Sequence, residues 1–298
     1  MTNAPSSLPT PEHIVAELVF LLELEPKGPD RFVGRRRPDG TGRVFGGQAI
    51  AQALEAASRT VDPSRTVHSL HAYFLRPGSD DLPIEFRVKR DLDGRSFSNR
   101  RVVASQDGKP ILNFVTSFQE PVEGPSHQHP DMPDVPPPEE LKPDSEVRQE
   151  VAKFVPDGPL KNLLLRPFPV DFRSVEPRDW LAPKKREPTS HIWFKTIAPL
   201  PAKPSLHRSV LAFISDFQIL ATALQPHGKS LHRGEVKAAS LDHAIWFHEP
   251  FAVDDWLLFA TEAPWSGGAR GYSRGQVFNR EGKLVASVSQ EGMLRHVK

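Results

Sequence analysis

Hydrophobic and polar residues alternate most regularly between positions 82 and 89. Leu, Ile, Phe and Val occupy positions 82, 84, 86 and 88, and Pro, Glu, Arg and Lys occupy the positions between them. Successive side chains of a strand point to opposite faces, so this pattern predicts a strand in a sheet with one packed and one solvent-exposed face. Residues 46–58 are instead small and apolar, which predicts a buried helix that a sheet approaches closely.

Three more strands are predicted in the first 120 residues, at 67–75, 95–105 and 111–119. Asp-Gly dipeptides at positions 93 and 107 precede or separate these strands and are typical of hairpin turns. The N-terminal part of the chain therefore predicts an antiparallel sheet packed against one helix.

The sequence pattern of the C-terminal part predicts the same arrangement of one helix and an antiparallel sheet. Its helix lies within residues 207–224, where the apolar residues leave no continuous polar stripe. Four strands follow, at residues 238–247, 256–262, 269–279 and 284–294. We therefore expect an α+β protein in which one unit, a helix and an antiparallel sheet, occurs twice.

The two units also align directly. Residues 45–54 (FGGQAIAQAL) match residues 215–224 (SDFQILATAL) at an offset of 170 positions, which places Gly46 opposite Asp216. At an offset of 174, further matches pair Arg100 with Arg274 and Asp107-Gly108-Lys109 with Glu281-Gly282-Lys283. A carboxylate that one copy has and the other replaces by glycine marks a candidate functional position, with one site per chain.

The stretch between the two units is rich in proline. Residues 121–143 contain eight prolines and little apolar periodicity, which is typical of an extended linker. We expect an N-terminal unit at residues 1–120, a linker at 121–159 and a C-terminal unit, which carries the candidate catalytic residues, at 160–298. The length of 298 residues suits two compact units better than one continuous core.

Composition narrows the possible functions. The net charge is +1, so no overall field attracts nucleic acid or an anionic membrane. The absence of cysteine excludes disulfides, thiolate metal sites and cysteine nucleophiles. Glu17 and Glu23 interrupt the apolar run at 14–24, which is too short to span a bilayer and does not look like a signal peptide. We therefore expect a cytoplasmic protein with no membrane insertion.

Several motifs occur in a fixed order along both units. The first unit carries FGGQ at 45–48, HAYFLRPG at 71–78, GRSFS at 94–98 and SFQ at 117–119. The second carries SD at 215–216, ALQPHG at 223–228, LDHAIWFH at 241–248, ARG at 269–271 and SQEG at 289–292. Together they closely resemble acyl-CoA thioesterase II, from about residue 18 to 295. The resemblance implies the double hotdog architecture, in which each of two tandem units wraps an antiparallel sheet around a central helix.

The resemblance also implies an activity, the hydrolysis of fatty acyl-CoA to free fatty acid and CoA by a bound water molecule. The family holds this water with an aspartate, a hydroxyl residue and a glutamine, which fall on Asp216, Ser240 and Gln290. The family often has threonine where this chain has Ser240. Both hydroxyls offer one donor and two acceptor lone pairs, although serine lacks the branching that stiffens threonine.

This chemistry is also reasonable from the residues alone. Thioester hydrolysis requires a water to be oriented and deprotonated, and a carboxylate can act as the base without a metal or cofactor. Asp216 is surrounded in sequence by Phe213 and Phe217, so burial should raise its pKa. Apart from the resemblance, an aspartate beside an apolar helical run is ordinarily a helix cap, and Ser240 and Gln290 are ordinary strand residues.

Charged and aromatic side chains suggest further contacts. Arginine presents a planar fork that matches phosphate, so the candidates for binding the CoA moiety are Arg95, Arg100, Arg270 and Arg274. Cross-strand ion pairs with Asp or Glu explain these arginines equally well. His243 and His248 are five positions apart, which places them on opposite faces of a strand, so we expect structural or pocket-wall histidines and no metal site.

Two other classes of function fit a hotdog chain. A hydratase or dehydratase acting on acyl thioesters requires His71 or His243 to approach Asp216. In a non-catalytic acyl-CoA binder, changing Asp216 alters affinity only. Release of free thiol from acyl-CoA distinguishes the hydrolase from both. Exposed sheet edges and faces also lead us to expect a homodimer or homotetramer.

Overall fold

The computed structural model describes residues 9–36, 42–177, 179, 182–229 and 234–297. The N-terminal elements are α1 (Pro11–Leu22), β1 (Leu24–Pro26), β2 (Arg31–Gly34), α2 (Gly46–Ser58), β3 (Thr66–Phe74), β4 (Ile84–Asp93), β5 (Phe97–Gln106) and β6 (Lys109–Gln119). The middle of the chain holds η1 (Pro138–Glu140), α3 (Asp144–Ala152) and α4 (Pro159–Leu165). The C-terminal elements are β7 (Val170–Ser174), β8 (Thr189–Thr196), α5 (Pro204–Ser215), α6 (Ile219–Thr222), η2 (Gln225–His227), β9 (Val236–Ser240), β10 (Asp242–Phe247), β11 (Leu257–Gly267), β12 (Arg270–Asn279) and β13 (Leu284–His296).

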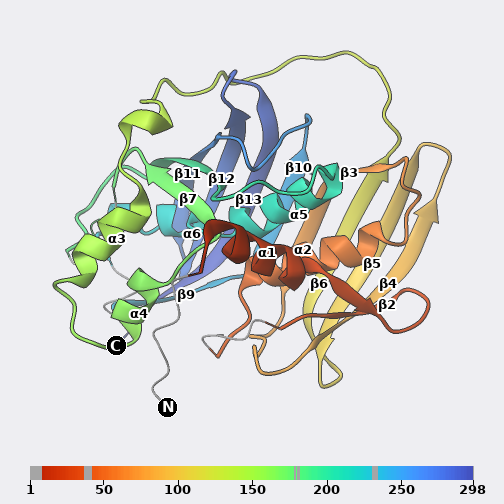
Figure 1. The fold of residues 1–298 in the computed structure, drawn as a ribbon, viewed down its shortest axis with the longest axis horizontal. Helices are drawn as coiled ribbons and strands as arrows, with labels where there is room; N and C mark the ends of the chain where they lie inside the picture. Colours follow the sequence, from red (N-terminus) through yellow and green to blue (C-terminus); the bar gives the residue numbers. More distant parts are fainter. Residues whose placement is uncertain (1–8, 37–41, 178, 180–181, 230–233, 298) are drawn as a thin grey trace.

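One 13-stranded sheet runs through the described part of the molecule (Figure 1). Its strand order is β1-β2-β4-β5-β6-β3-β10-β13-β12-β11-β8-β7, and β9 pairs with β13 beside this path. Strands at equal distances from the two ends of this order are the corresponding strands of the two halves. The repeat seen in the sequence is therefore also a repeat of strand topology. The halves join where β3 pairs antiparallel with β10, with Ala72 opposite His243.

The helices α2 and α5 pack against each other, and α2 also packs on strands β4, β5 and β6 (Figure 1). Ile50, Ala53 and Leu54 of α2 are buried, as the small and apolar sequence predicted. A single hydrophobic cluster includes Leu54 from the first half and Ile245 from the second. The two halves therefore share one core, and the α+β fold class is confirmed.

Most predicted strands are found within a few residues of the expected bounds. Ile84, Phe86 and Val88 are buried on one face of β4, as their alternation indicated. The second Asp-Gly dipeptide forms the tight turn between β5 and β6, with positive φ angles of 46° at Asp107 and 72° at Gly108. These are the left-handed conformations that such a turn requires.

Two predicted C-terminal elements are divided. The expected strand at 238–247 is interrupted at Leu241, whose N–H donates to the Glu291 carbonyl while its own carbonyl accepts from the Phe74 N–H. The chain thereby passes from pairing with β13 alone to pairing with both β3 and β13. The helical stretch within 207–224 ends at Ser215 and resumes at Ile219, with Gln218 at a φ of 65° between them.

The proline-rich segment lies along the C-terminal half (Figure 1). Met132, Val135 and Leu141 pack against the cluster formed by Trp193, Trp256, Leu258 and Phe278. Glu139 also forms an ion pair with Arg280 at 2.8 Å. Residues 121–137 form no helix or strand, whereas residues from Asp144 to Leu165 form α3 and α4. The segment is therefore a packed part of the fold.

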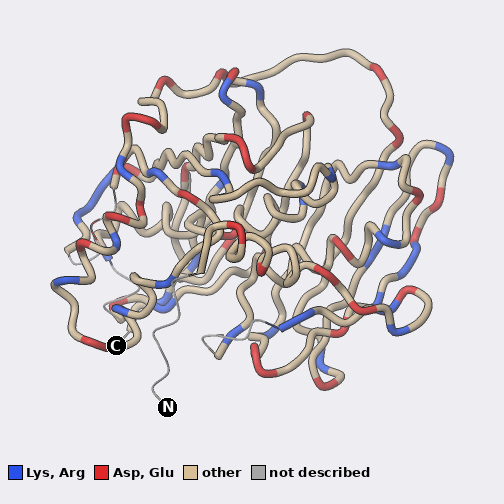
Figure 2. Tube along the Cα trace, viewed as in Figure 1, with Lys and Arg blue, Asp and Glu red and all other residues tan. Residues whose placement is uncertain are grey.

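The charged residues are distributed evenly. Figure 2 shows Lys and Arg interspersed with Asp and Glu along the trace, in agreement with the net charge of +1. Among the helices that the structure describes, none combines the length and the hydrophobicity needed to cross a membrane.

Candidate active site

A pocket of about 570 Å³ opens where α5 ends, and it contains Asp216 and Ser240. Its apolar wall includes Phe45, Phe168 and Phe217, whose rings pack with centroid distances of 4.6 Å (Phe45 to Phe217) and 4.5 Å (Phe168 to Phe217). The pocket therefore combines an aromatic surface with a small polar centre.

The polar centre is a chain of hydrogen bonds that joins three separate elements. Asp216 follows the last residue of α5, Ser240 ends β9, and Gln290 lies in β13. The Gln290 Nε2 donates to Ser240 Oγ at 2.7 Å, and Ser240 Oγ donates to Asp216 Oδ1 at 3.2 Å. The structure thus brings the three residues singled out in the sequence into one hydrogen-bonded group.

The surroundings of Asp216 change its acidity. Burial raises the pKa of the carboxyl from 3.8 to about 6, because a charged group loses hydration. Hydrogen bonds from Ser240, from Gln290 and from the backbone N–H of Gly47 oppose this increase by stabilising the carboxylate. Gly47 belongs to the first turn of α2, so the positive end of this helix faces the carboxylate. Asp216 is therefore poised to accept a proton near neutral pH.

Gly46 lies directly against this carboxylate. A Cβ atom at position 46 would lie 2.5 Å from Asp216 Oδ2, which is much closer than atoms approach without a bond. The two positions that the internal repeat aligns are thus in contact across the boundary between the halves. Only one of them has room for a side chain, which explains the single aspartate in physical terms.

His243 is a buried residue of this site whose contact with the polar centre the sequence did not reveal. Its Nδ1 lies 2.5 Å from Gln290 Oε1, and its Nε2 lies 2.9 Å from Ser215 Oγ. Burial lowers the pKa of the imidazole to about 4, so the ring is neutral at pH 7. Nδ1 then donates to Gln290 and holds its amide with the nitrogen toward Ser240. His243 lies opposite Ala72 where β10 pairs with β3, so the contact depends on the pairing of strands from the two halves.

The four arginines proposed from the sequence lie elsewhere. Arg100 is 1% exposed and donates to Thr60 and Asp93 inside the N-terminal half. Arg274 donates to Glu262 on the neighbouring strand, and Arg95 is exposed on the loop before β5. The structure thus gives Arg100 and Arg274 the structural and cross-strand contacts that were the alternative interpretation.

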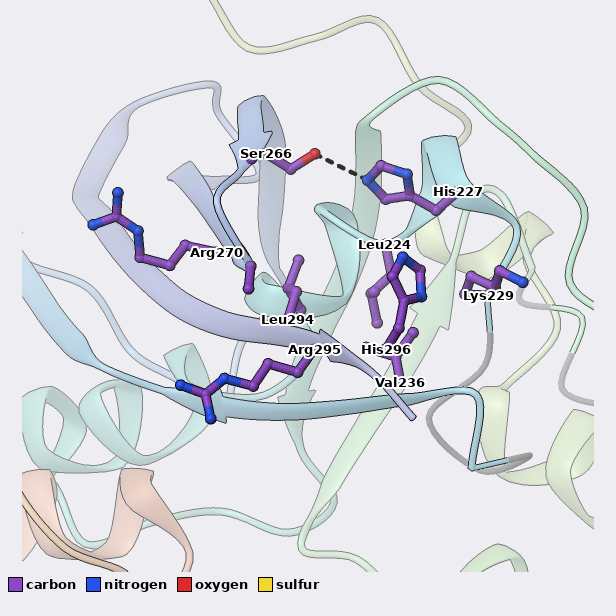
Figure 3. Close-up of a pocket in the computed structure, with 11 residues that line it drawn as sticks. Leu224, His227, Lys229, Val236, Ser266, Arg270, Leu294, Arg295 and His296 are labelled. Carbon is purple, nitrogen blue, oxygen red and sulfur yellow. Dashed lines mark hydrogen bonds between the residues drawn. The ribbon is translucent and has the colours of Figure 1, made fainter. Parts of the chain in front are cut away.

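Arg270 lines a second pocket of about 390 Å³ (Figure 3). It pairs with Glu291 at 3.5 Å. In Figure 3, Arg270 and Arg295 extend to one side of this pocket, and His227, hydrogen-bonded to Ser266 at 2.9 Å, lies on the other. The arginines that line the pocket of Asp216 are instead Arg43, Arg148 and Arg166.

The fold and the site together define a class, the double hotdog proteins with a polar centre between the two repeats. A family model described as acyl-CoA thioesterase matches residues 167–293, and one described as acyl-CoA thioesterase N-terminal domain matches residues 35–119. The chain belongs to the acyl-CoA thioesterase family, and it is therefore a thioester hydrolase.

Individual relatives are similar to this chain over nearly its whole length. Acyl-CoA thioesterase 2 of Haemophilus influenzae is 37% identical over 95% of this chain and 98% of its own. The crystal structure of an acyl-CoA thioesterase II from Mycobacterium marinum is 38% identical, with a TM-score of 0.75, and covers 95% of this chain and 98% of its own. A hot dog fold protein from Alicyclobacillus acidocaldarius, 19% identical, has a TM-score of 0.73 over 95% of this chain and 99% of its own, and supports the fold alone.

Proposed function

We propose that this protein hydrolyses fatty acyl-CoA to free fatty acid and CoA, with a water molecule activated by Asp216, Ser240 and Gln290. The observation that carries the proposal is the hydrogen-bonded chain from Gln290 through Ser240 to a carboxylate whose pKa is raised to about 6. A carboxylate with this pKa is largely ionised at pH 7 and is a stronger base than an exposed aspartate. It also lines a pocket whose aromatic wall suits an apolar acyl chain.

In this mechanism, Asp216 removes a proton from water as the oxygen attacks the thioester carbonyl carbon. Ser240 and Gln290 fix the position of the carboxylate and the water, so that the attack requires little reorganisation. The positive end of α2 stabilises the negative charge that develops beside Gly47. The tetrahedral intermediate then expels the CoA thiolate, which takes the proton held by Asp216. The products are the free acid and CoA.

His243 supports this arrangement without contacting the substrate in the proposal. The neutral imidazole orients the amide of Gln290, which in turn orients the hydroxyl of Ser240. No hydrogen bond joins His243 to Asp216 directly within the described structure. A hydratase mechanism, which needs a histidine aimed at the substrate beside Asp216, is therefore less well supported than hydrolysis.

The test is release of free CoA thiol from acyl-CoA by variants at the three positions. Asp216→Asn keeps the size of the side chain and removes the base, so kcat should fall by roughly two to four orders of magnitude. Ser240→Ala and Gln290→Ala should each lower kcat less. The double variant should lose less than the two effects multiplied together, because both residues position the same water.

Asp91→Asn is a matched control, since Asp91 pairs with Arg101 on the surface of the sheet and does not line the pocket of Asp216. Circular dichroism establishes that each variant is folded. Folded Asp216→Asn protein that releases thiol at the unmutated rate would exclude this mechanism. Binding of acyl-CoA by the unmutated protein without thiol release would instead identify a hydratase or a non-catalytic binder.

A further inference from the structure

The pocket that contains Asp216 has a wall that neither repeat supplies. Helices α3 and α4 contribute Arg148 and Leu163 to its lining, and Arg166 follows α4 directly. The two family models match residues 35–119 and 167–293, so these side chains come from the intervening segment. The segment that joins the halves therefore also shapes the cavity in which we place the reaction.

Arg148 is unusual among the charged groups of this wall. It is only partly accessible, and loss of hydration lowers the pKa of its guanidinium, although the attraction of Asp144 opposes this. Its side chain lines the pocket, and a guanidinium offers five N–H donors. An anionic ligand in the pocket could accept hydrogen bonds from these donors.

The charged residues of the pocket wall indicate the charge of such a ligand. Three arginines, Arg43, Arg148 and Arg166, line the pocket, against two carboxylates, Asp144 and Asp216. Guanidinium groups bind phosphate and carboxylate oxygens through two parallel hydrogen bonds. CoA carries several phosphate groups, and an acyl chain that ends in a carboxylate offers the same chemistry. The excess of arginines over carboxylates in this pocket suits a substrate that is strongly anionic at one end.

We propose that α3 forms part of the substrate site and that Arg148 binds an anionic group of the thioester substrate, most directly a phosphate of CoA. This proposal rests on the proposed function, because it assigns Arg148 to the pocket of Asp216. It makes the joining segment a determinant of substrate recognition, separate from the residues that activate water.

The first experiment compares one acyl chain on two carriers, CoA and N-acetylcysteamine, which lacks phosphate. With the CoA ester, Arg148→Gln should raise KM about 10-fold and leave kcat unchanged, because a charge-assisted contact to the non-reacting part of the substrate is lost. With the N-acetylcysteamine ester, the variant should match the unmutated protein. Arg148→Lys should restore part of the affinity, since it keeps the charge but loses the planar fork. Arg101→Gln, an exposed arginine paired with Asp91, is the control.

A third substrate distinguishes the two sources of the anion. If the N-acetylcysteamine ester of an acid with a second, terminal carboxylate loses affinity with Arg148→Gln, and the CoA ester of a plain fatty acid does not, then Arg148 binds the acyl terminus. A loss confined to the CoA ester and a loss confined to the ester with a terminal carboxylate both support a contact between Arg148 and an anion. Equal behaviour of Arg148→Gln and Arg101→Gln on every substrate would overturn the proposal, as would an equal loss on the uncharged ester.

A binding titration separates this proposal from the catalytic one. Calorimetry with free CoA needs no turnover, and it can be carried out in the Asp216→Asn background. There, Arg148→Gln should weaken CoA binding about 10-fold if phosphate is the anion. If Asp216→Asn proves fully active, the water-activating role of Asp216 fails, while the titration still reports on Arg148.

Discussion

Asp216 is subject to two opposing effects whose balance sets its chemistry. Loss of hydration favours the neutral acid, whereas the donors of Ser240, Gln290 and Gly47 favour the carboxylate. The first effect is larger, so the pKa rises to about 6. Stronger donation would produce a weaker base, and weaker donation would leave the group protonated at neutral pH. Each donor therefore shifts the pKa of the carboxylate as well as positioning it.

This balance predicts the pH dependence of the reaction. The base works only when ionised, so kcat/KM should rise with pH, pass its midpoint at about 6 and level off above pH 7. Ser240→Ala removes a donor that lowers the pKa of Asp216, so its midpoint should move to higher pH. Initial rates of thiol release between pH 4.5 and 8 in a constant-ionic-strength buffer measure both curves. A midpoint near 4 in the unmutated protein would show that the carboxylate is not desolvated.

At this scale, the sequence predicted part of the site. The resemblance proposed Asp216, Ser240 and Gln290, which the structure joins by hydrogen bonds, and the phenylalanines next to Asp216 indicated the direction of its pKa. The contact of His243 with Gln290 was not predictable, because it depends on the pairing of β10 with β13 and β3. The surroundings of the arginines were not predictable either. Arg100 is buried and Arg148 is partly exposed, and no local sequence pattern indicates this difference.

Among the elements, the start of α2 lies directly against Asp216. Gly46→Ala should place a methyl group against Asp216 Oδ2 and push the carboxylate away from Ser240. We expect kcat to fall roughly 10- to 100-fold, because a displacement of about 1 Å costs that much. Helix propensity itself favours alanine, so thermal unfolding should not reveal a loss of helix.

Gly124→Ala is the control for this change, because a Cβ atom there would meet nothing within 4 Å. Thiol release by both variants, with circular dichroism of each, measures the effect. Activity of Gly46→Ala equal to that of Gly124→Ala would mean that the carboxylate moves freely and that its contact with α2 has no role.

The elements that follow a strong local pattern were predicted well, and the others were not. β4 and the hairpin at Asp107 satisfy rules of alternation and turn chemistry. Helix α3 is short and polar, and it is stabilised by packing of Ala152 with Val155 and Leu164. No hydrophobic periodicity in the sequence predicts this cluster. The break after α5 coincides with the left-handed backbone of Gln218, a conformation that the local sequence does not indicate.

Across the whole molecule, the two halves leave an apolar area on the outer face of the sheet where they meet. Tyr73 on β3 is 62% exposed, Val115 on β6 is 38% exposed and Trp246 on β10 is 36% exposed. His71 contacts the Trp246 ring at a centroid distance of 5.1 Å. Because β6, β3 and β10 are neighbours in the sheet, these side chains form one patch, which we name the central outer patch.

We expect the protein to be a homodimer or homotetramer that buries the central outer patch, because exposed apolar area of this kind favours self-association. Light scattering at micromolar concentration should give a mass at least twice that of one 33.3 kDa chain. Tyr73→Glu should lower this mass, whereas Val122→Glu, at a residue that is 75% exposed outside the sheet, should not. A monomer in the unmutated protein would contradict the expectation, and an unchanged mass in Tyr73→Glu would place the contact elsewhere.

The pairing of β3 with β10 has a consequence for how the molecule is assembled. Residues that lie opposite each other there, such as Ala72 and His243, are separated by more than half of the chain. During translation, the N-terminal half emerges with the edge of β3 unpaired and one side of α2 uncovered. In two separate chains, closing this edge would depend on cellular protein concentration. Tethering the second half converts the encounter into an intramolecular one, with an effective concentration that dilution cannot lower.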